Sequence, residues 1–229
     1  TDSFTVAGAS AVSASAVTGG NTITLTTTGL TSTSSTPAVN YVAATGDVLD
    51  ASVATNEVAN GGAVAAADGV APTFTANRTA LNTIVLTFSE NVDVTTTDGS
   101  GYTVAGATVT ANSDPAGIAS TITLTTTGLT STSSTPLVTY ATLAGTTVDA
   151  SPATNEVGDG TSASATDGVA PTFTANRTAL NTIVLTFSET VTSGGVDTDS
   201  FTVAGASAVS ASTHKHIFYS SCELRCSNR

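Results

Sequence analysis

Long stretches of this sequence occur twice, and two of the three pairs are 99 residues apart. This repetition is the strongest limit on how the chain can fold. The identical pairs are residues 69–90 with 168–189, 22–37 with 121–136, and 2–15 with 199–212, and a diverged copy of the last pair lies at 101–113. From residue 69 to residue 168 the offset is 99 residues. An offset of this length is far longer than one coil of a solenoid and matches a single β-sandwich domain. The sequence therefore predicts tandem copies of one domain.

Short runs of alternating apolar and polar residues predict strands within the copy in the middle of the chain. Residues 83–88 and 120–125 alternate, so Ile122 and Leu124 are expected to point inward while the threonines face solvent. Residues 102–105 and 137–140 predict two more strands, and threonine is abundant because its branched β-carbon suits a pleated sheet. We predict an all-β fold of tandem immunoglobulin-like sandwiches. The expected core residues are Phe74, Leu86, Phe88, Tyr102, Leu124 and Tyr140.

The domain boundaries follow from taking Ala71-Pro72 as the start of a copy. The predicted units are an incomplete repeat lacking its first strands at 1–69, a complete repeat at 70–168, an incomplete repeat lacking its last strands at 169–212, and a non-repeat tail at 213–229. The two incomplete pieces are complementary. Either the sequence is a window cut from a longer array of repeats, or one subunit completes the next, head to tail, by strand or half-domain complementation to form a filament.

The charge balance excludes several classes of function. The chain has 17 Asp and Glu against 5 Lys and Arg, a net charge of −12, and up to residue 212 only Arg78 and Arg177 are cationic. Such a chain repels phosphate backbones and anionic lipid, so we expect no binding to nucleic acid. No apolar run approaches the roughly 20 residues of a membrane span, so membrane insertion is not expected.

Few residues in the repeats can perform catalysis. No His, Cys or Lys precedes residue 213, which leaves no general base near neutrality, no thiol nucleophile and no reactive amine. A pair of carboxylates such as Glu90 and Asp93 remains a candidate, but acids on a threonine-rich scaffold more often solvate loops. We predict that the chain is not an enzyme.

Several short motifs occur in the order typical of a known family. They are Ala71-Pro72, Ile84–Glu90, Tyr102–Gly106, Val138–Tyr140, and Asp149 with Asn155-Glu156. Together they resemble the bacterial immunoglobulin-like repeats of S-layer proteins and large surface adhesins, of the SwmB and SbsA type. The resemblance implies an extracellular, cell-surface β-sandwich that serves as a spacer, fibre or adhesin segment, often stiffened by calcium, with no catalytic activity. The alternative to a structural role is an adhesin-type module that recognises glycan or protein through loops at one end of the sandwich.

Oxygen-bearing side chains gather at the end of each copy, just before the next Ala-Pro. Calcium takes several oxygen ligands from carboxylates, Asn and backbone carbonyls, and an ion at a junction would restrict bending between domains. The candidate ligands are Asp149, Asn155, Glu156, Asp159 and Asp167 in the middle copy and Asp50, Asn56, Glu57 and Asp68 in the first. Asp and Asn also form turns, so the alternative is that these residues only shape solvated loops.

Two further features carry weaker chemical signals. Asn77 and Asn176 each begin an Asn-Arg-Thr glycosylation sequon, expected just after a strand. The tail differs in composition from the repeats. It holds both histidines and both cysteines, which suit zinc or a small disulfide loop, and we assign it no function; these residues are His214, His216, Cys222 and Cys226.

Overall fold

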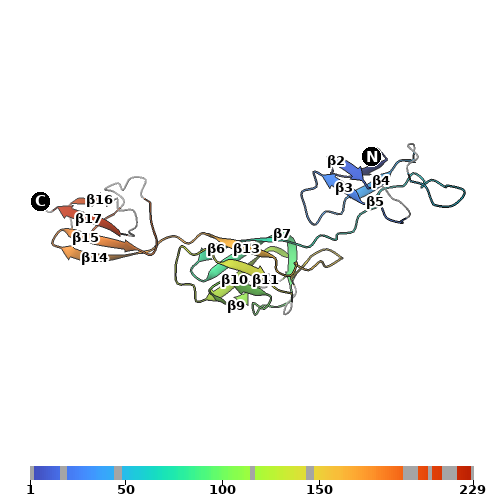
Figure 1. The fold of residues 1–229 in the computed structure, drawn as a ribbon. Coiled ribbons are helices and arrows are strands. Elements are labelled where there is room, and N and C mark those ends of the chain that lie inside the picture. The colour runs from blue at the N-terminus through green and yellow to red at the C-terminus, as the bar shows by residue number, and fades with distance from the viewer. Residues whose placement is uncertain are drawn as a thin grey trace.

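The computed structural model describes residues 3–15, 20–43, 48–113, 117–142, 147–192, 201–205, 208–212 and 221–227. Within these residues the regular structure consists of strands, without an α-helix, which confirms the predicted all-β class. The strands form three groups that follow one another along the chain (Figure 1). We call them the first unit (β1–β5), the middle unit (β6–β13) and the last unit (β14–β17).

The middle unit contains the longest strands. Its strands are β6 (Phe74–Ala80), β7 (Thr83–Val94), β8 (Tyr102–Val104), β9 (Thr108–Asn112), β10 (Ala119–Thr127), β11 (Leu137–Tyr140), β12 (Thr147–Asp149) and β13 (Ser162–Asp167). They pair in the order β8-β11-β13-β6-β7-β10-β9, and β12 pairs with the second half of β7. Strand β13 joins two parts of this arrangement, because its first half pairs antiparallel with β11 and its second half pairs parallel with β6. The arrangement is compatible with a β-sandwich.

The alternation predicted from the sequence determines the core of the middle unit. Along β7 every second residue from Ile84 to Val94 is buried, and in β10 both Ile122 and Leu124 are buried as expected. All six predicted core residues are buried, which confirms that prediction. The aromatic residues among them contact one another in pairs. The ring centroids of Tyr102 and Tyr140 lie 5.2 Å apart, and those of Phe74 and Phe88 lie 5.7 Å apart.

The first unit consists of two small sheets. Its strands are β1 (Phe4–Val6), β2 (Ala11–Ala14), β3 (Leu25–Thr28), β4 (Ala38–Tyr41) and β5 (Val64–Ala65), paired in the orders β1-β4-β5 and β2-β3. These orders match β8-β11-β13 and β9-β10 of the middle unit. The core is open, however: Val58 is 47% exposed, whereas Val157, its counterpart 99 residues later, is fully buried.

The last unit forms one sheet. Its strands are β14 (Phe173–Ala179), β15 (Thr182–Phe187), β16 (Ala208–Ser212) and β17 (Ser221–Ser227), in the order β14-β15-β17-β16. Strand β17 belongs to the segment that the sequence assigned to a non-repeat tail. It pairs with β15 as β10 pairs with β7: Leu224 is opposite Ile183, as Leu124 is opposite Ile84. Every residue of β14 is exposed.

Candidate metal centre at a junction between units

The connection between the first and middle units begins with a turn at Asp68. One carboxylate oxygen of Asp68, Oδ1, accepts a hydrogen bond of 3.0 Å from the backbone N–H of Val70. A short polar side chain that bonds the backbone two residues on is the usual reason for Asp at such a turn. The second connection is built alike, because Asp167 Oδ1 accepts a 3.0 Å bond from the Val169 N–H.

A second loop, which follows β12, positions Asp149. Its Oδ1 accepts hydrogen bonds from the backbone N–H groups of Ser151 and Asn155 and from the Ser151 hydroxyl, and its Oδ2 accepts a 2.7 Å bond from Asn155 Nδ2. Burial opposes ionisation of Asp149, but these hydrogen bonds outweigh it and lower the pKa of the carboxyl group. Asn155 Nδ2 also donates to the Asp68 carbonyl oxygen at 3.3 Å, which ties this loop to the linker.

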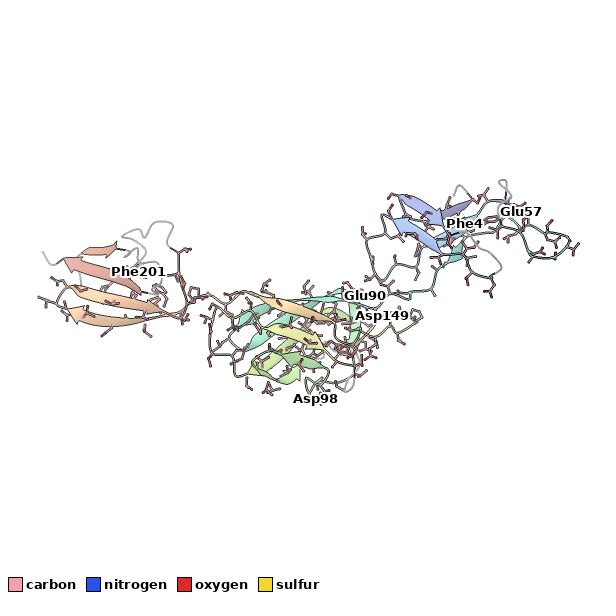
Figure 2. The ribbon with its side chains drawn as sticks, in the orientation of Figure 1. Phe4, Glu57, Glu90, Asp98, Asp149 and Phe201 are labelled. Atoms are coloured by element: carbon pink, nitrogen blue, oxygen red, sulfur yellow. The ribbon has the colours of Figure 1, made fainter. Side chains whose placement is uncertain are left out.

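Glu90 brings a third carboxylate to the same place. It lies on β7 at an inward-facing position between Phe88 and Val92. One carboxylate oxygen from each of Asp68, Glu90 and Asp149 lies within 4.8 Å of the others. The exposed fractions of the three residues are 6%, 7% and 1%. Figure 2 shows Glu90 and Asp149 close together at the end of the middle unit. We call these three residues the junction triad.

Two buried carboxylate oxygens of the junction triad have no hydrogen-bond partner among the residues that the structure describes. They are Asp68 Oδ2 and Glu90 Oε1. Burial raises the pKa of Glu90, and the nearby charges of Asp68 and Asp149 add to this, whereas the nearby hydroxyl of Thr33 opposes it. Buried like charges with unpaired oxygens are costly unless a cation neutralises them. An all-oxygen donor set of this kind suits a hard divalent cation such as calcium.

The structure groups the predicted calcium ligands differently from the sequence analysis, which had grouped them by repeat copy. Asp68 and Asp149 meet in the junction triad, with Asn155 bonded to both, although the sequence placed them in separate clusters. The other predicted ligands make local contacts. Glu156 and Glu57 accept bonds from Tyr140 and Tyr41, Asp159 caps the backbone at Thr142, Asp50 bonds Asn56, and Asp167 caps Val169.

Glu90 is the member of the junction triad that sequence analysis did not propose as a metal ligand. The sequence does contain a signal for it, because Glu90 is an acidic residue at an inward-facing position of β7. The other inward-facing residues of this strand are apolar and buried, and they include Ile84, Leu86, Phe88 and Val92. The pairing of Glu90 with Asp93 considered from the sequence does not form, because residues three apart in a strand point to opposite faces, and Asp93 is exposed.

The contact between neighbouring units also recurs along the chain. Thr33 Oγ1 donates to Ser89 Oγ at 3.1 Å, and 99 residues later Thr132 Oγ1 donates to Ser188 Oγ at 2.9 Å. In each case a threonine of the TSTSST loop of one unit bonds the serine that follows the phenylalanine of the second hairpin strand, Phe88 or Phe187, in the next unit. Both junctions therefore use the same contact.

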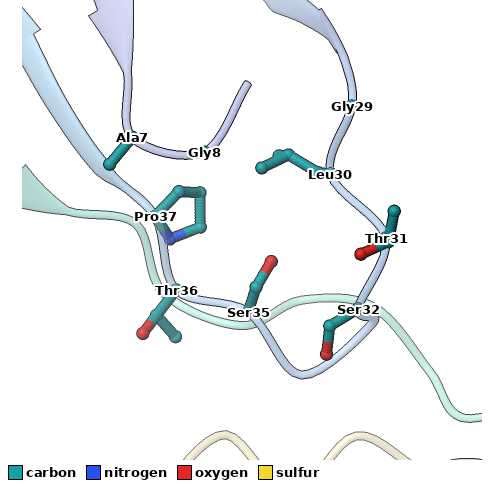
Figure 3. A pocket seen from close by; sticks show the side chains of 9 residues that line it. All are labelled: Ala7, Gly8, Gly29, Leu30, Thr31, Ser32, Ser35, Thr36 and Pro37. Carbon is teal, nitrogen blue, oxygen red and sulfur yellow. The ribbon is translucent and has the colours of Figure 1, made fainter. Parts of the chain in front are cut away.

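The TSTSST loops border two equivalent pockets. One is lined by residues that include Gly29, Leu30, Ser32, Ser35 and Pro37 (Figure 3). The other lies at the matching positions of the middle unit, from Gly128 to Pro136. Their linings consist of small and hydroxyl-bearing residues together with one leucine, so the pocket is a property of the repeat.

The remaining predicted sites have different outcomes. Asn77 and Asn176 lie within β6 and β14 rather than just after a strand, and Asn77 Oδ1 accepts a 2.8 Å bond from the Thr166 hydroxyl. Cys222 and Cys226 lie in β17, whereas His214 and His216 lie outside the described residues.

Compared with models of known protein families, with curated proteins and with solved structures, the chain matches none of them. Among the residues that the structure describes, no helix has the length and apolar character that crossing a lipid bilayer requires.

Proposed function

We propose that this chain is a structural component of an extracellular repeat protein, in which tandem immunoglobulin-like sandwiches transmit tension along a fibre, stalk or surface layer. The order β6-β7-β10-β9 corresponds to strands A, B, E and D of a constant-type immunoglobulin sandwich, and β8-β11-β13 corresponds to C, F and G. This strand order supports the immunoglobulin-like assignment. The net negative charge and the absence of His, Cys and Lys before residue 213 favour a mechanical role over a catalytic one.

The observation that carries the proposal is the parallel pairing of β6 with β13. Ala76, Asn77 and Arg78 are paired with residues 165–167. The chain enters the middle unit at the start of β6 and leaves it at the end of β13. Tension on the two connections therefore acts along these strands and loads their hydrogen bonds together rather than one at a time. The Thr166 hydroxyl donates to Asn77 Oδ1, which adds a side-chain bond across the same pair.

Pulling single full-length chains by their ends tests this function directly. We expect the middle unit to unfold in one step and at a higher force than either of the other units, because only its two terminal strands are paired with each other in the described residues. Forced unfolding reports the unfolding rate. A middle unit that extends without measurable resistance would contradict the load-bearing role.

Gly168 offers a specific test of the β6–β13 pair. Its N–H donates to the Arg78 carbonyl oxygen at 2.9 Å, and a Cβ at this position would lie 2.7 Å from that oxygen. We expect Gly168→Ala to destabilise the middle unit by about 1–3 kcal/mol, because the added methyl group would force the two strands apart, and to lower its unfolding force. The matched control is Gly69→Ala at the first connection, where an added Cβ meets nothing within 4 Å. Equal effects of the two substitutions would show that the pair does not bear the load.

Calcium at the junction triad forms the second part of the proposal. An ion held by Asp68, Glu90 and Asp149 would fix the linker against the middle unit and limit bending at the junction. At 100 times its dissociation constant, calcium is expected to stabilise the protein by about 2.7 kcal/mol. Scanning calorimetry at low protein concentration, with calcium and then with chelator, measures this shift.

Two variants separate specific binding from a general salt effect. Glu90→Gln removes one ligand charge, so we expect it to abolish the response to calcium and to stabilise the metal-free protein by relieving like-charge repulsion. Asp93→Asn, on the opposite, exposed face of β7, should respond as the unaltered protein does. A calcium response that survives in Glu90→Gln would place the ion elsewhere.

The adhesin alternative would use the pockets beside the TSTSST loops. Their recurrence in two units favours a repeated binding surface, but Thr33 and Thr132 of the same loops already bond the next unit. Glycan-array binding by the full chain that is lost when residues 31–36 and 130–135 are replaced would establish the adhesin role.

A further inference from the structure

We infer that Asn60 is a site of self-modification, at which the folded loop before β5 promotes the conversion of the side-chain amide into a carboxylate. The reaction is a deamidation, and its co-reactant is water. It concerns the chemistry of one surface loop, so it is independent of the proposed mechanical function.

The sequence around Asn60 favours this reaction. Asn60 is followed by Gly61 and Gly62, and it is the only asparagine of the chain that precedes a glycine. Deamidation begins when the backbone nitrogen of the next residue attacks the amide carbon, and a side chain on that next residue hinders the attack. Glycine has no side chain and reaches the widest range of backbone conformations, so it allows the ring to close.

The backbone nitrogen of Gly61 is free to react. Residues 60–62 are exposed and lie outside the strands, and a Cβ at Gly61 would meet nothing within 4 Å. Among the residues that the structure describes, the Gly61 N–H has no hydrogen-bond acceptor. The counterpart N–H in the middle unit, that of Gly160, donates to the Tyr140 carbonyl oxygen at 2.9 Å.

The difference between the two glycines has a local cause in the sequence. The first copy has Gly62 where the middle copy has Thr161. Ordering a glycine costs more backbone entropy than ordering a threonine, so a pair of glycines resists fixed hydrogen bonding. The nucleophile of the reaction is therefore left unpaired by the sequence of this loop.

The side chain of Asn60 is held with its carbonyl group against a hydrogen-bond donor. Its Oδ1 accepts a 2.5 Å bond from the backbone N–H of Ala43. Negative charge develops on this oxygen when a nucleophile attacks Cγ, and a backbone N–H already aimed at the oxygen stabilises that charge. The leaving group, Nδ2, has no hydrogen-bond partner among the described residues, so no bond has to break when it departs.

The reaction is balanced by water alone. A bond forms between the Gly61 nitrogen and Asn60 Cγ, the Cγ–Nδ2 bond breaks, and the proton of the Gly61 N–H leaves with Nδ2 as ammonia. The product is a five-membered succinimide ring. Water then opens the ring at either of its two carbonyl carbons. Opening at Cγ gives aspartate, and opening at the backbone carbonyl carbon gives isoaspartate.

The middle copy shows that the aspartate product fits the loop. The residue at the equivalent position is Asp159, and its Oδ1 accepts a 3.2 Å bond from the Thr142 N–H, as Asn60 Oδ1 does from Ala43. Residues 158–160 are exposed as well, so the exposure of this loop is a property of the repeat. Aspartate at position 60 should keep the bond to Ala43. Isoaspartate instead lengthens the main chain by one carbon just before β5.

Asn56 in the same unit is a built-in control. It precedes Glu57, whose side chain hinders ring closure. Its Nδ2 donates to Asp50 Oδ2 at 2.9 Å, and its backbone N–H donates to Asp50 Oδ1. The leaving group is therefore held in place, and we expect Asn56 to stay unmodified while Asn60 reacts.

Ageing the full chain at neutral and at mildly alkaline pH tests the inference. Each event adds one negative charge to a net charge of −12, so ion-exchange chromatography separates the products. Peptide mass spectrometry locates the modified residue, and labelling by an isoaspartyl methyltransferase identifies isoaspartate. We expect Asn60 to react first and to give both products. The rate should rise with pH, because the attacking nitrogen must lose its proton.

A parallel sample in concentrated denaturant at the same pH measures what the fold contributes. A folded backbone normally slows deamidation by holding the amide away from the next nitrogen. Here the Ala43 N–H and the unpaired Gly61 N–H are features of the folded loop. The reaction at Asn60 should therefore be at least as fast in the folded chain as in the denatured chain.

Two glycine variants isolate the ring-closing step. Gly61→Ala should slow the reaction severalfold, because a methyl group then stands beside the attacking nitrogen. Gly62→Ala is the matched control and should change the rate little, since it lies one residue further on. A Cβ at either position meets nothing within 4 Å, so neither substitution should disturb the fold.

Two results would overturn the inference. One is a rate at Asn60 that is lower in the folded chain than in denaturant, which would show that the loop protects the amide. The other is an equal rate in Gly61→Ala and Gly62→Ala, which would show that the reaction does not pass through the Gly61 nitrogen. Neither result bears on forced unfolding or on calcium binding, which test the proposed function.

Discussion

Replacing Phe88 by alanine is expected to lower the free energy of unfolding of the middle unit by about 3–5 kcal/mol, the usual cost of truncating a buried aromatic side chain. Phe88 is buried in β7, and its ring packs against Phe74, which in turn contacts Tyr102. Since the chain has few aromatic residues, little else nearby can fill the cavity that truncation leaves.

Urea denaturation followed by near-ultraviolet circular dichroism measures this loss, because Tyr102 and Tyr140 report on the same core. The matched control is Phe187→Ala in the last unit. Phe187 pairs with Phe173 at the same centroid distance of 5.7 Å, but it is only partly buried, so its truncation should cost clearly less. An unchanged unfolding midpoint for Phe88→Ala would show that the core is not where the structure places it.

Replacing Arg78 by alanine is expected to destabilise the middle unit by about 3–4 kcal/mol. The guanidinium is fully buried, and it donates to carbonyl oxygens of the TSTSST loop and, through Nε, to the Leu81 carbonyl oxygen at 3.2 Å. Hydrogen bonds to charged groups contribute about 1.5–3 kcal/mol each and do not add fully when they share one side chain. Truncation also leaves a cavity beneath the loop.

Hydrogen exchange across residues 130–136 in the full chain measures the effect on the loop, and urea denaturation measures the effect on the unit. The control is Arg177→Ala, which lies in an identical sequence but is exposed, so the stability of the last unit should change by no more than about 0.5 kcal/mol. Equal losses at the two positions would contradict the difference in burial on which this prediction depends.

Much of the fold could be predicted from the sequence, because strands and their inward faces follow from a local pattern. The alternation of β7 and β10 predicts which side chains of those strands are buried, and the glycine, proline and asparagine between runs predict where strands end. The repeat length predicts the size of one unit. None of these depends on which strands become neighbours.

The candidate site was predicted only in part. Asp68 and Asp149 were recognised as possible ligands, but they were assigned to separate clusters because they lie 81 residues apart, from residue 68 to residue 149. Glu90 was not recognised, since its role depends on the end of β7 lying beside both the linker and the loop after β12. Such juxtapositions arise from strand pairing, which no local pattern specifies.

The sequence TANRTA occurs twice, at residues 75–80 and 174–179, and the two copies show what the sequence determines and what the tertiary structure decides. Both copies form the same hairpin, with the same pairing between its strands, because backbone preference and alternation are properties of the segment itself. In one copy Arg78 is buried against four carbonyl oxygens, and in the other Arg177 is exposed. Burial depends on which strands cover the hairpin, and this is decided by long-range contacts alone.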